Sequence, residues 1–365
     1  MMAKTPVIGW EYGTAYELFV SLFVLTQPDQ FGIRPAYAAS VRSRIPAAER
    51  KLVEDILPVF GLPLKWIHEL PAPRDAISAL WALKQIPPAE RMIKLQHLED
   101  SDAYPGKTPE EIEKHSKIKE ILLRVAAEGK WTTEDRNFIH QLLGKLDKGV
   151  KKEALARCLD WWSRPEELGE ACLSALQAYY QSFFEEEEKR LEPILKESVQ
   201  RAQERAAVLN LDELFLELSQ GVKLDDAFRV EKFVFAPAYW QTPLILYERL
   251  NANTMLVLYG ARPADMSVMP GEIVPEGLVR ALKALADPTR LKILNFLAQE
   301  ELAPSELARR LKLRAPTVTH HMNELRLAGL VNVLVEGSEK KYTARMESVD
   351  TIHKNLKDFI NASSE

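Results

Sequence analysis

The chain has 365 residues, of which 46% are hydrophobic and 28% are charged, and its formal net charge is −5 at pH 7. This composition is that of an ordinary soluble protein, and the length exceeds one usual domain, so we expect two domains. No apolar run reaches the roughly 18 residues of a membrane span, and the N-terminus lacks a signal-peptide pattern. We therefore expect a cytoplasmic protein without a membrane partner.

The charge is divided unevenly along the chain. Residues 273–365 contain 14 Lys and Arg against 12 Asp and Glu, so this part carries about +2 and the remainder about −7. The negative total argues against a protein coated with nucleic acid along its whole length. The slight excess of positive charge at the C-terminal end is compatible with DNA binding and does not establish it.

Helical patterns dominate the first 270 residues. Apolar residues recur at helical spacing, and prolines, capping residues and turn-rich connections mark the expected helix starts. We expect helices over residues 10–26, 46–60, 71–86, 87–99, 108–127, 132–146, 150–162 and 165–206. Pro193 should kink the last helix or end one piece of it. Residues 1–270 are thus predicted to form a large helical domain.

The pattern changes at residues 231–263. Two runs, KFVFA and TMLVLYG, are β-branched and aromatic and are bounded by Pro, Asn and Gly, which is typical of strands. We expect them to form a strand pair near residues 231–260, with a short helical excursion over residues 242–250. Tyr239 and Trp240 follow the first strand, where side chains can face a cavity. They are our candidate effector-binding residues, with ordinary core packing as the alternative.

The sequence lacks recognisable catalytic motifs. It has no G-x-S-x-G, G-x-x-x-x-G-K-[ST], G-x-G-x-x-G or H-E-x-x-H pattern. His68 and His97 each stand near a glutamate in isolated pairs, which favours surface or satisfied structural histidines. Cys158 and Cys172 lack the spacing of metal ligands and should be buried small hydrophobes. We expect that the protein is not an enzyme and has neither a cofactor nor a metal.

Residues 273–365 predict a second domain. After a first helix over residues 275–286, Asp287 and Pro288 signal another start, because the carboxylate caps free amides and proline needs no donor there. Its expected buried side chains are Leu291, Leu294 and Leu297. A short helix then begins near Pro304 and leads through a tight turn into a further helix. The runs LVNVLVEGS and KKYTARM alternate as two strands before a last helix.

The helix that Pro316 opens is the candidate recognition helix for DNA. At about 100° per residue, its apolar side chains fall within one narrow sector that should pack inward. These inward positions are Val318, Met322, Leu325 and Gly329. The candidate DNA-reading residues lie opposite or on the flanks and are Thr317, Thr319, His320 and Asn323. They are small or form hydrogen bonds, which suits a major groove about 12 Å wide.

Three basic residues flank this helix. Arg314 lies in the preceding turn, where it can reach a phosphate or a guanine edge, although an exposed surface arginine is an equal alternative. Lys340 and Lys341 make the returning edge of the strand pair basic. A ribbon in this place can lie along the DNA backbone and contribute salt-sensitive affinity rather than sequence discrimination.

The C-terminal residues closely resemble the ArsR-type winged helix-turn-helix family of bacterial transcription regulators. The resemblance lies in ALADPTRLKIL, in SELARRLKLRAPTVTHHMNELRLAGLV and in the wing EGSEKKY. It implies a homodimer that places two recognition helices in successive major grooves of a palindromic, double-stranded operator. The positions that match the family's DNA-contacting motif are Arg314, Thr317, Thr319 and His320, with the wing lysines beside the backbone.

The chain departs from the family at its metal-sensing motif. Where many members have ELCVCDL, this chain has ELAPSEL, so Ala303 and Ser305 replace the cysteines and thiolate coordination is impossible there. Asp350 and His353 form a single pair, which cannot complete a tetrahedral zinc site. Any signal is therefore expected to come through the large helical domain, with a small molecule as a possible effector.

The phrases FAPAYWQTP and MLVLYGARP resemble an uncharacterised helical domain that precedes some ArsR-type modules. This resemblance implies that residues 1–270 have a role in sensing or in shaping a dimer. The predicted fold class is thus mainly α, with a large helical N-terminal domain that contains a small β element, followed by a winged helix-turn-helix domain. An enzymatic or protein-docking N-terminal domain fused to a DNA-binding module remains the alternative.

Overall fold

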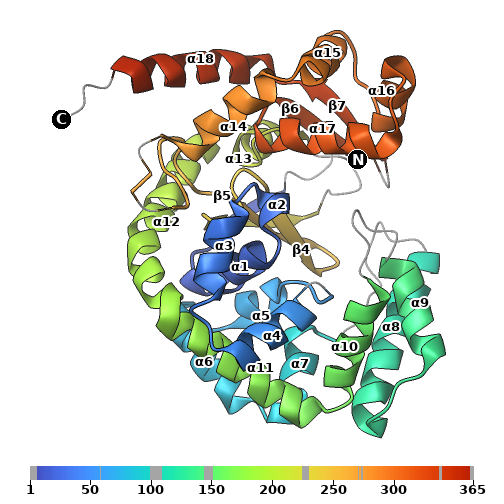
Figure 1. Cartoon of the computed structure of the whole chain (residues 1–365). Coiled ribbons are helices and arrows are strands. Elements are labelled where there is room, and N and C mark those ends of the chain that lie inside the picture. Colours follow the sequence, from blue (N-terminus) through green and yellow to red (C-terminus); the bar gives the residue numbers. More distant parts are fainter. Residues whose placement is uncertain are drawn as a thin grey trace. The chain divides into compact units, whose positions relative to one another are not determined.

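The computed structural model describes residues 6–57, 59–98, 109–143, 151–223, 230–269, 271–272, 274–336 and 339–361. Helices dominate these residues and two small sheets accompany them, which confirms the predicted fold class (Figure 1). By compactness the chain divides into two units. The helical unit comprises the described residues of 11–193 and 248–256, and the winged-helix unit comprises those of 1–10, 194–247 and 257–365.

This division does not coincide with the expected boundary between residues 270 and 273. It falls at Pro193, inside helix α12 (Glu185–Ala206), and again within strands β4 (Leu246–Asn251) and β5 (Thr254–Gly260). Part of the preceding sequence joins the winged helix through strand β2 (Val222–Lys223), which pairs in parallel with β6 (Val331–Glu336). The winged-helix unit therefore reaches further back along the chain than residues 273–365.

The helical unit contains the helices that precede α12. They are α1 (Thr14–Thr26), α2 (Pro28–Phe31), α3 (Pro35–Arg42), α4 (Ala47–Ile56), α5 (Leu64–Glu69), α6 (Ala76–Gln85), α7 (Pro88–Leu95), α8 (Pro109–Glu128), α9 (Thr133–Leu143), α10 (Lys152–Trp162) and α11 (Pro165–Tyr179). Large aromatic side chains, among them Trp162, Tyr179 and Phe184, are buried in its core. Within the described ranges, no helix is both long and apolar enough to cross a membrane.

The expected single helix over residues 165–206 is interrupted before its proline. A π-helical turn, η1 (Tyr180–Phe184), separates α11 from α12. Pro193 lies inside α12, so the helix continues across it instead of ending there. The missing N–H of proline removes one helical hydrogen bond, which packing on both sides must offset.

The first sheet has the strand order β1-β3-β5-β4. Strand β1 (Val7–Trp10) is parallel to β3 (Lys232–Ala238), with Trp10 opposite Phe235. The two expected strands are therefore neighbours, as predicted. The prediction of a helical excursion between them was wrong, because Leu246–Asn251 is strand β4. The side chain of Asn251 accepts a hydrogen bond of 2.9 Å from the Asn253 amide, and this turn sends the chain back into β5.

Among the described residues, five helices of the winged-helix unit lie between α12 and the wing, and one follows the wing. They are α13 (Leu211–Leu218), α14 (Glu276–Leu285), α15 (Pro288–Leu297), α16 (Pro304–Leu311) and α17 (Ala315–Leu327), followed by β6, β7 (Glu339–Ala344) and α18 (Met346–Asn361). Of these, α13 precedes the segment that sequence analysis assigned to the second domain. The predicted strand pair is confirmed, since β6 and β7 are antiparallel, but the sheet has a third strand, with the order β2-β6-β7.

Gly221 makes the third strand possible. Its φ is +116°, and a Cβ there would lie 2.9 Å from Asn332 Oδ1 and 3.1 Å from the Val331 carbonyl oxygen. Only glycine adopts this conformation and allows such a close backbone approach without strain. The Val333 amide can then donate a hydrogen bond of 2.7 Å to the Gly221 carbonyl.

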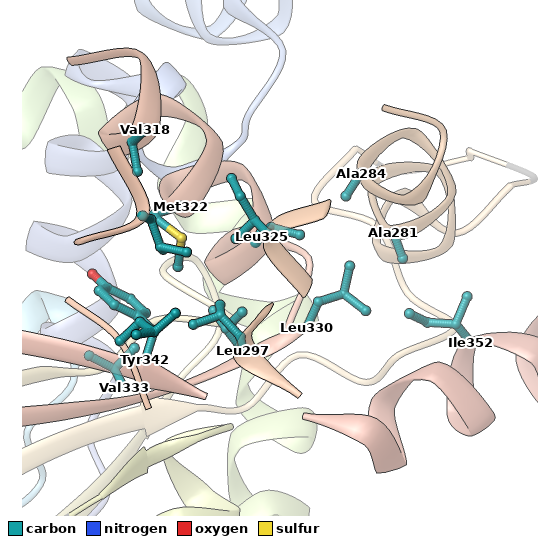
Figure 2. Packing of buried hydrophobic residues seen from close by; sticks show 14 of the residues in the cluster. Ala281, Ala284, Leu297, Val318, Met322, Leu325, Leu330, Val333, Tyr342 and Ile352 are labelled. Atoms are coloured by element: carbon teal, nitrogen blue, oxygen red, sulfur yellow. The ribbon is translucent and has the colours of Figure 1, made fainter. Parts of the chain in front are cut away.

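The apolar side of α17 packs into a single core. Val318, Met322 and Leu325 are at most 2% exposed, as the helical period predicted. Figure 2 shows Met322 near Tyr342 and Val333 of the wing, and Ile352 of α18 facing Ala281 of α14. The prediction for α15 was wrong at one position, because Leu291 is 48% exposed whereas Ile293 is completely buried. The core thus uses a slightly rotated face of α15.

Asp287 caps α15 as predicted. Its carboxylate accepts hydrogen bonds from the amides of Thr289 and Arg290, at 2.8 and 2.9 Å. These amides, with that of Arg290 as the largest cause, hold the pKa of Asp287 below its ordinary value of 3.8. A pKa that is depressed in the folded state means that the stabilisation is present above the unfolded pKa and disappears as the pH falls through the folded pKa.

We predict that Asp287→Ala lowers the free energy of unfolding at pH 7 by about 0.5 to 2 kcal/mol, the usual cost of a lost cap. The difference from wild type should shrink below about pH 4, where the carboxyl becomes protonated in the unfolded chain. Denaturant unfolding of both proteins at several pH values measures this difference in the free energy of unfolding. Asp287→Asn is the control: it retains an acceptor and should cost less, and its difference from wild type should change equally at low pH, because both variants lack the titrating carboxyl group. A cost for Asp287→Ala that is constant down to acid pH would contradict the role of the charge.

Candidate nucleic-acid interface

The outward side of α17 is polar and open to solvent. Thr317, Thr319 and His320 are exposed and Asn323 is half-buried, while the apolar stripe of the same helix faces the core. The helical period therefore places the candidate DNA-reading side chains together. Their contact with DNA remains a prediction. The short hydroxyl, imidazole and amide groups offer both donors and acceptors to base edges.

The turn between α16 and α17 sets the direction of the candidate recognition helix. Lys312 adopts a left-handed conformation with a φ of 56°, and the Leu313 amide donates a hydrogen bond of 3.0 Å to the Ala308 carbonyl. This bond closes the end of α16 in the way of a Schellman motif. Arg314 follows with extended backbone at the start of α17 and provides no side-chain cap. Its side chain is exposed, as is that of Lys312, a basic residue that sequence reasoning missed.

His320 and His321 are neighbours in sequence with different environments. Their ring centroids lie 5.9 Å apart, but His321 is half-buried whereas His320 is exposed. Burial lowers the pKa of His321, and the nearby Asp287 opposes this effect only in part. His321 is therefore neutral near pH 7, and His320 is the more exposed of the two histidines.

The two wing lysines differ in the structure, although the sequence treats them alike. Successive residues of a strand point to opposite sides. Lys340 is exposed, while the Lys341 ammonium lies 4.0 Å from the Glu301 carboxylate and its side chain is 35% exposed. The wing strand is also fixed at its base, where Leu302 and Tyr342 exchange two backbone hydrogen bonds of 2.9 and 3.0 Å. Lys340 is thus the better placed of the two for a phosphate.

Tyr239 and Trp240, the candidate effector-binding pair, are completely buried. The Tyr239 hydroxyl donates a hydrogen bond of 2.7 Å to the Ser267 carbonyl, and the Arg262 guanidinium lies 5.6 Å from the centre of its ring. These contacts favour core packing, the alternative considered for both residues. The ring of Tyr239 packs near the Arg262 guanidinium, and its side chain has no solvent-exposed surface that a ligand could contact.

The helical unit holds a buried polar network that the sequence did not reveal. The Glu11 carboxylate accepts a hydrogen bond from the Tyr16 hydroxyl and one of 2.7 Å from His68 Nδ1, and Arg74 Nε lies 3.4 Å away. His68 is therefore a satisfied structural histidine, with Glu11 rather than its sequence neighbour as the partner. Because these residues are far apart in the chain, spacing along the sequence gave no signal of the network.

Two further sequence expectations concern thiols and metals. Burial raises the pKa of the Cys158 thiol, so this cysteine is an unreactive core residue. Ala303 and Ser305 lie at the start of α16, where neither side chain can coordinate a soft metal. Among the described residues, no group of three or more His, Cys, Asp or Glu side chains converges on a possible metal position.

Comparison with known proteins gives matches to bacterial regulators. Residues 287–333 match the family described as bacterial regulatory protein, arsR family. The arsenical resistance operon repressor of Staphylococcus xylosus is 38% identical over 84 residues, which cover 23% of this chain and 80% of the repressor. The HTH-type transcriptional regulator CmtR of Mycobacterium bovis is 39% identical over 71 residues, which cover 20% of this chain and 60% of CmtR.

Solved structures give matches of similar extent. HlyU from Vibrio cholerae N16961 is 34% identical, and the match covers 24% of this chain and 94% of HlyU with a TM-score of 0.19. The relatives described here therefore correspond to no more than about a quarter of this chain.

The different environments of the wing lysines lead to a prediction. Lys340→Ala should lower the slope of log affinity against log salt concentration by about 1, because one phosphate contact releases about one counterion. Lys341→Ala should change the slope less, since Glu301 already neutralises part of its charge. Titration of the full-length protein with a DNA duplex at several salt concentrations measures both slopes. Equal slopes for wild type and Lys340→Ala would show that Lys340 of the wing does not contact a DNA phosphate.

Proposed function

Because this chain belongs to the arsR family of bacterial regulatory proteins, we propose that it is a sequence-specific transcription regulator that inserts α17 into the major groove of DNA. The observation that carries this proposal is the two-sided character of α17. Its apolar stripe is buried, and the opposite side presents Thr317, Thr319 and His320 to solvent. A helix with such a side fits a major groove, where bases are distinguished by their donors and acceptors.

The basic residues around α17 have a positioning role in this proposal. Arg314 stands at the start of the recognition helix, and Lys340 stands on the wing. Phosphate contacts from both sides would fix the register of the helix on the duplex without reading sequence. The modest excess of positive charge in residues 273–365 suits a protein that contacts DNA over one limited surface.

We further propose that the protein acts as a homodimer on a palindromic operator. Apolar side chains remain exposed on the helices at both ends of the winged helix, where Leu282 of α14 is 37% exposed and Ile360 of α18 is 69% exposed. Ile352, Leu356 and Phe359 of α18 instead pack on the core of the same unit. Burial of the exposed residues against a second copy would remove apolar surface from water.

We propose that regulation comes through the sequence ahead of residue 273. The buried polar groups around Glu11 are hydrogen-bonded to one another, which suits a structural network, so we propose a regulator rather than an enzyme. An effector would control DNA binding if it bound the competent and incompetent arrangements with different affinity.

The proposed reading residues can be tested on a selected operator. His320→Ala and Thr317→Ala should each weaken specific binding by about 1 to 3 kcal/mol, the range of a good base contact, and should leave binding to random DNA nearly unchanged. Lys354→Ala, an exposed change on α18, is the control. Fluorescence titration with both duplexes measures the difference. Unaltered discrimination in both α17 variants would refute this placement of the recognition helix.

The dimer has its own test. The double variant Leu282→Glu and Ile360→Glu places charges on the two exposed apolar positions, so the mass measured by sedimentation should fall from that of a dimer to that of a monomer. Leu282→Ala with Ile360→Ala is the matched control and should weaken association less. A wild-type protein that sediments as a monomer at micromolar concentration would contradict the proposal.

A further inference from the structure

A cavity of about 370 Å³ lies inside the winged-helix unit. Its walls come from the turn before β2, from the loops after β3 and β5, from α14 and α18, and from the end of α17. This volume is within the range of small-molecule pockets and is far too small for a macromolecule. The cavity is separate from the outward side of α17.

The charged side chains that line the cavity are all positive. Arg262, Arg280 and Arg345 all line it, and none of the described lining residues is an aspartate or a glutamate. Guanidinium groups remain protonated in proteins and recognise carboxylate and phosphate groups through paired N–H donors. The wall therefore favours an anion.

Each of the three arginines is held in place by a backbone carbonyl. Arg262 donates to Thr242 at 2.7 Å, Arg345 donates to Gln220 at 3.0 Å, and Arg280 is 3.5 Å from the Leu327 carbonyl. A guanidinium carries five N–H groups in a fixed plane, so one such bond orients it. Arg280 is also 3.4 Å from Glu276, a residue of its own helix that does not line the cavity.

The remaining wall combines hydrogen-bonding and apolar groups. Ser348, Thr351 and Asn355 follow one side of α18, and Leu278 and Ile352 provide an apolar floor. Hydroxyl and amide groups can bind the polar substituents of a ligand, while the floor accommodates a carbon skeleton. A purely inorganic ion would leave the apolar part unused.

We propose that this cavity binds a small organic anion that carries two or more carboxylate or phosphate groups. Such a ligand matches the arginines by charge, with Arg262 and Arg345 as its main partners because Glu276 neutralises part of the charge of Arg280. Its carbon skeleton matches the floor. Carboxylates and phosphates share the acceptor geometry that guanidinium recognises, so the experiment has an arm for each.

The position of the cavity also connects ligand binding to the recognition helix, a step that rests on the function proposed above. Leu327 is the last residue of α17, and its carbonyl is the partner of Arg280. The Arg345 amide, directly after the wing, donates to the Leu330 carbonyl at 2.9 Å. An anion that draws these arginines toward the cavity acts on the junction between α17 and the wing. Thermodynamic linkage then requires DNA and the anion to change each other's affinity by the same factor.

The first test is calorimetric titration of the full-length protein, without DNA and at constant ionic strength, with citrate in one arm and fructose 1,6-bisphosphate in the other. At least one should bind with a dissociation constant below about 1 mM. Arg262→Gln and Arg345→Gln should each weaken that binding about tenfold or more, since each removes a charge-assisted contact. Arg164→Gln, an exposed change in the helical unit, should leave the affinity unaltered.

Gly277 offers a second test that keeps all three arginines. It lines the cavity in the first turn of α14, and an added Cβ there would meet no atom within 4 Å. Gly277→Glu therefore places a competing carboxylate at the cavity without a clash, and a negative charge in this helical turn is favourable to the fold. Binding should weaken about tenfold relative to Gly277→Gln, which has the same size and no charge.

The outcomes separate the site from the function. Binding of citrate alone identifies a carboxylate ligand, and binding of the bisphosphate alone identifies a phosphate ligand. No binding in either arm up to about 10 mM, or equal binding by the two Gly277 variants, overturns the site. If an anion binds in the cavity but the protein does not select an operator, the proposed function fails and the site stands. An operator affinity that is unchanged by the bound anion overturns only the link to α17.

Discussion

The position of the proposed DNA-reading residues depends on the burial of three apolar side chains. Val318, Met322 and Leu325 form one stripe of α17, and their removal from water fixes the rotation of the helix about its axis. Once this rotation is fixed, the period of the helix leaves Thr317 and His320 on the outside. The orientation of this surface thus follows from packing in the core behind it, together with the turn between α16 and α17.

Sequence patterns predicted the features that arise from local spacing. Helix periodicity gave the inward stripe of α17, and the pairing of Asp287 with Pro288 gave the start of α15. Contacts between distant residues were not predictable in this way. The third strand of the wing sheet has only two residues, and the pairing of Val222 with Val333 has no local signature. The partner of His68 was missed for the same reason, since Glu11 is separated from it by 57 positions.

Sequence analysis was also limited where side chains of the same type have different surroundings. Lys340 and Lys341 are the same residue type at adjacent positions, and the structure distinguishes them by exposure and by the position of Glu301 beside Lys341. The position of Tyr239 at the end of a strand suggested that its side chain faces a cavity. In the fold the side chain is instead buried, with its ring against the Arg262 guanidinium. The arginines of the cavity could not be grouped beforehand, because they come from three segments that meet only after folding. Such sites require the tertiary structure, whereas the α17 surface required only one helix.

The pairing of β2 with β6 has a consequence for the autonomy of the DNA-binding module. A fragment that begins at residue 273 would lack β2, and one side of β6 would then present unpaired backbone groups to solvent. An exposed strand edge of this kind pairs readily with other chains, which promotes aggregation and domain swapping. The segment that contains Gly221 and β2 therefore protects the winged helix from unwanted strand addition. The natural folding boundary of the module lies ahead of β2, more than fifty residues before residue 273.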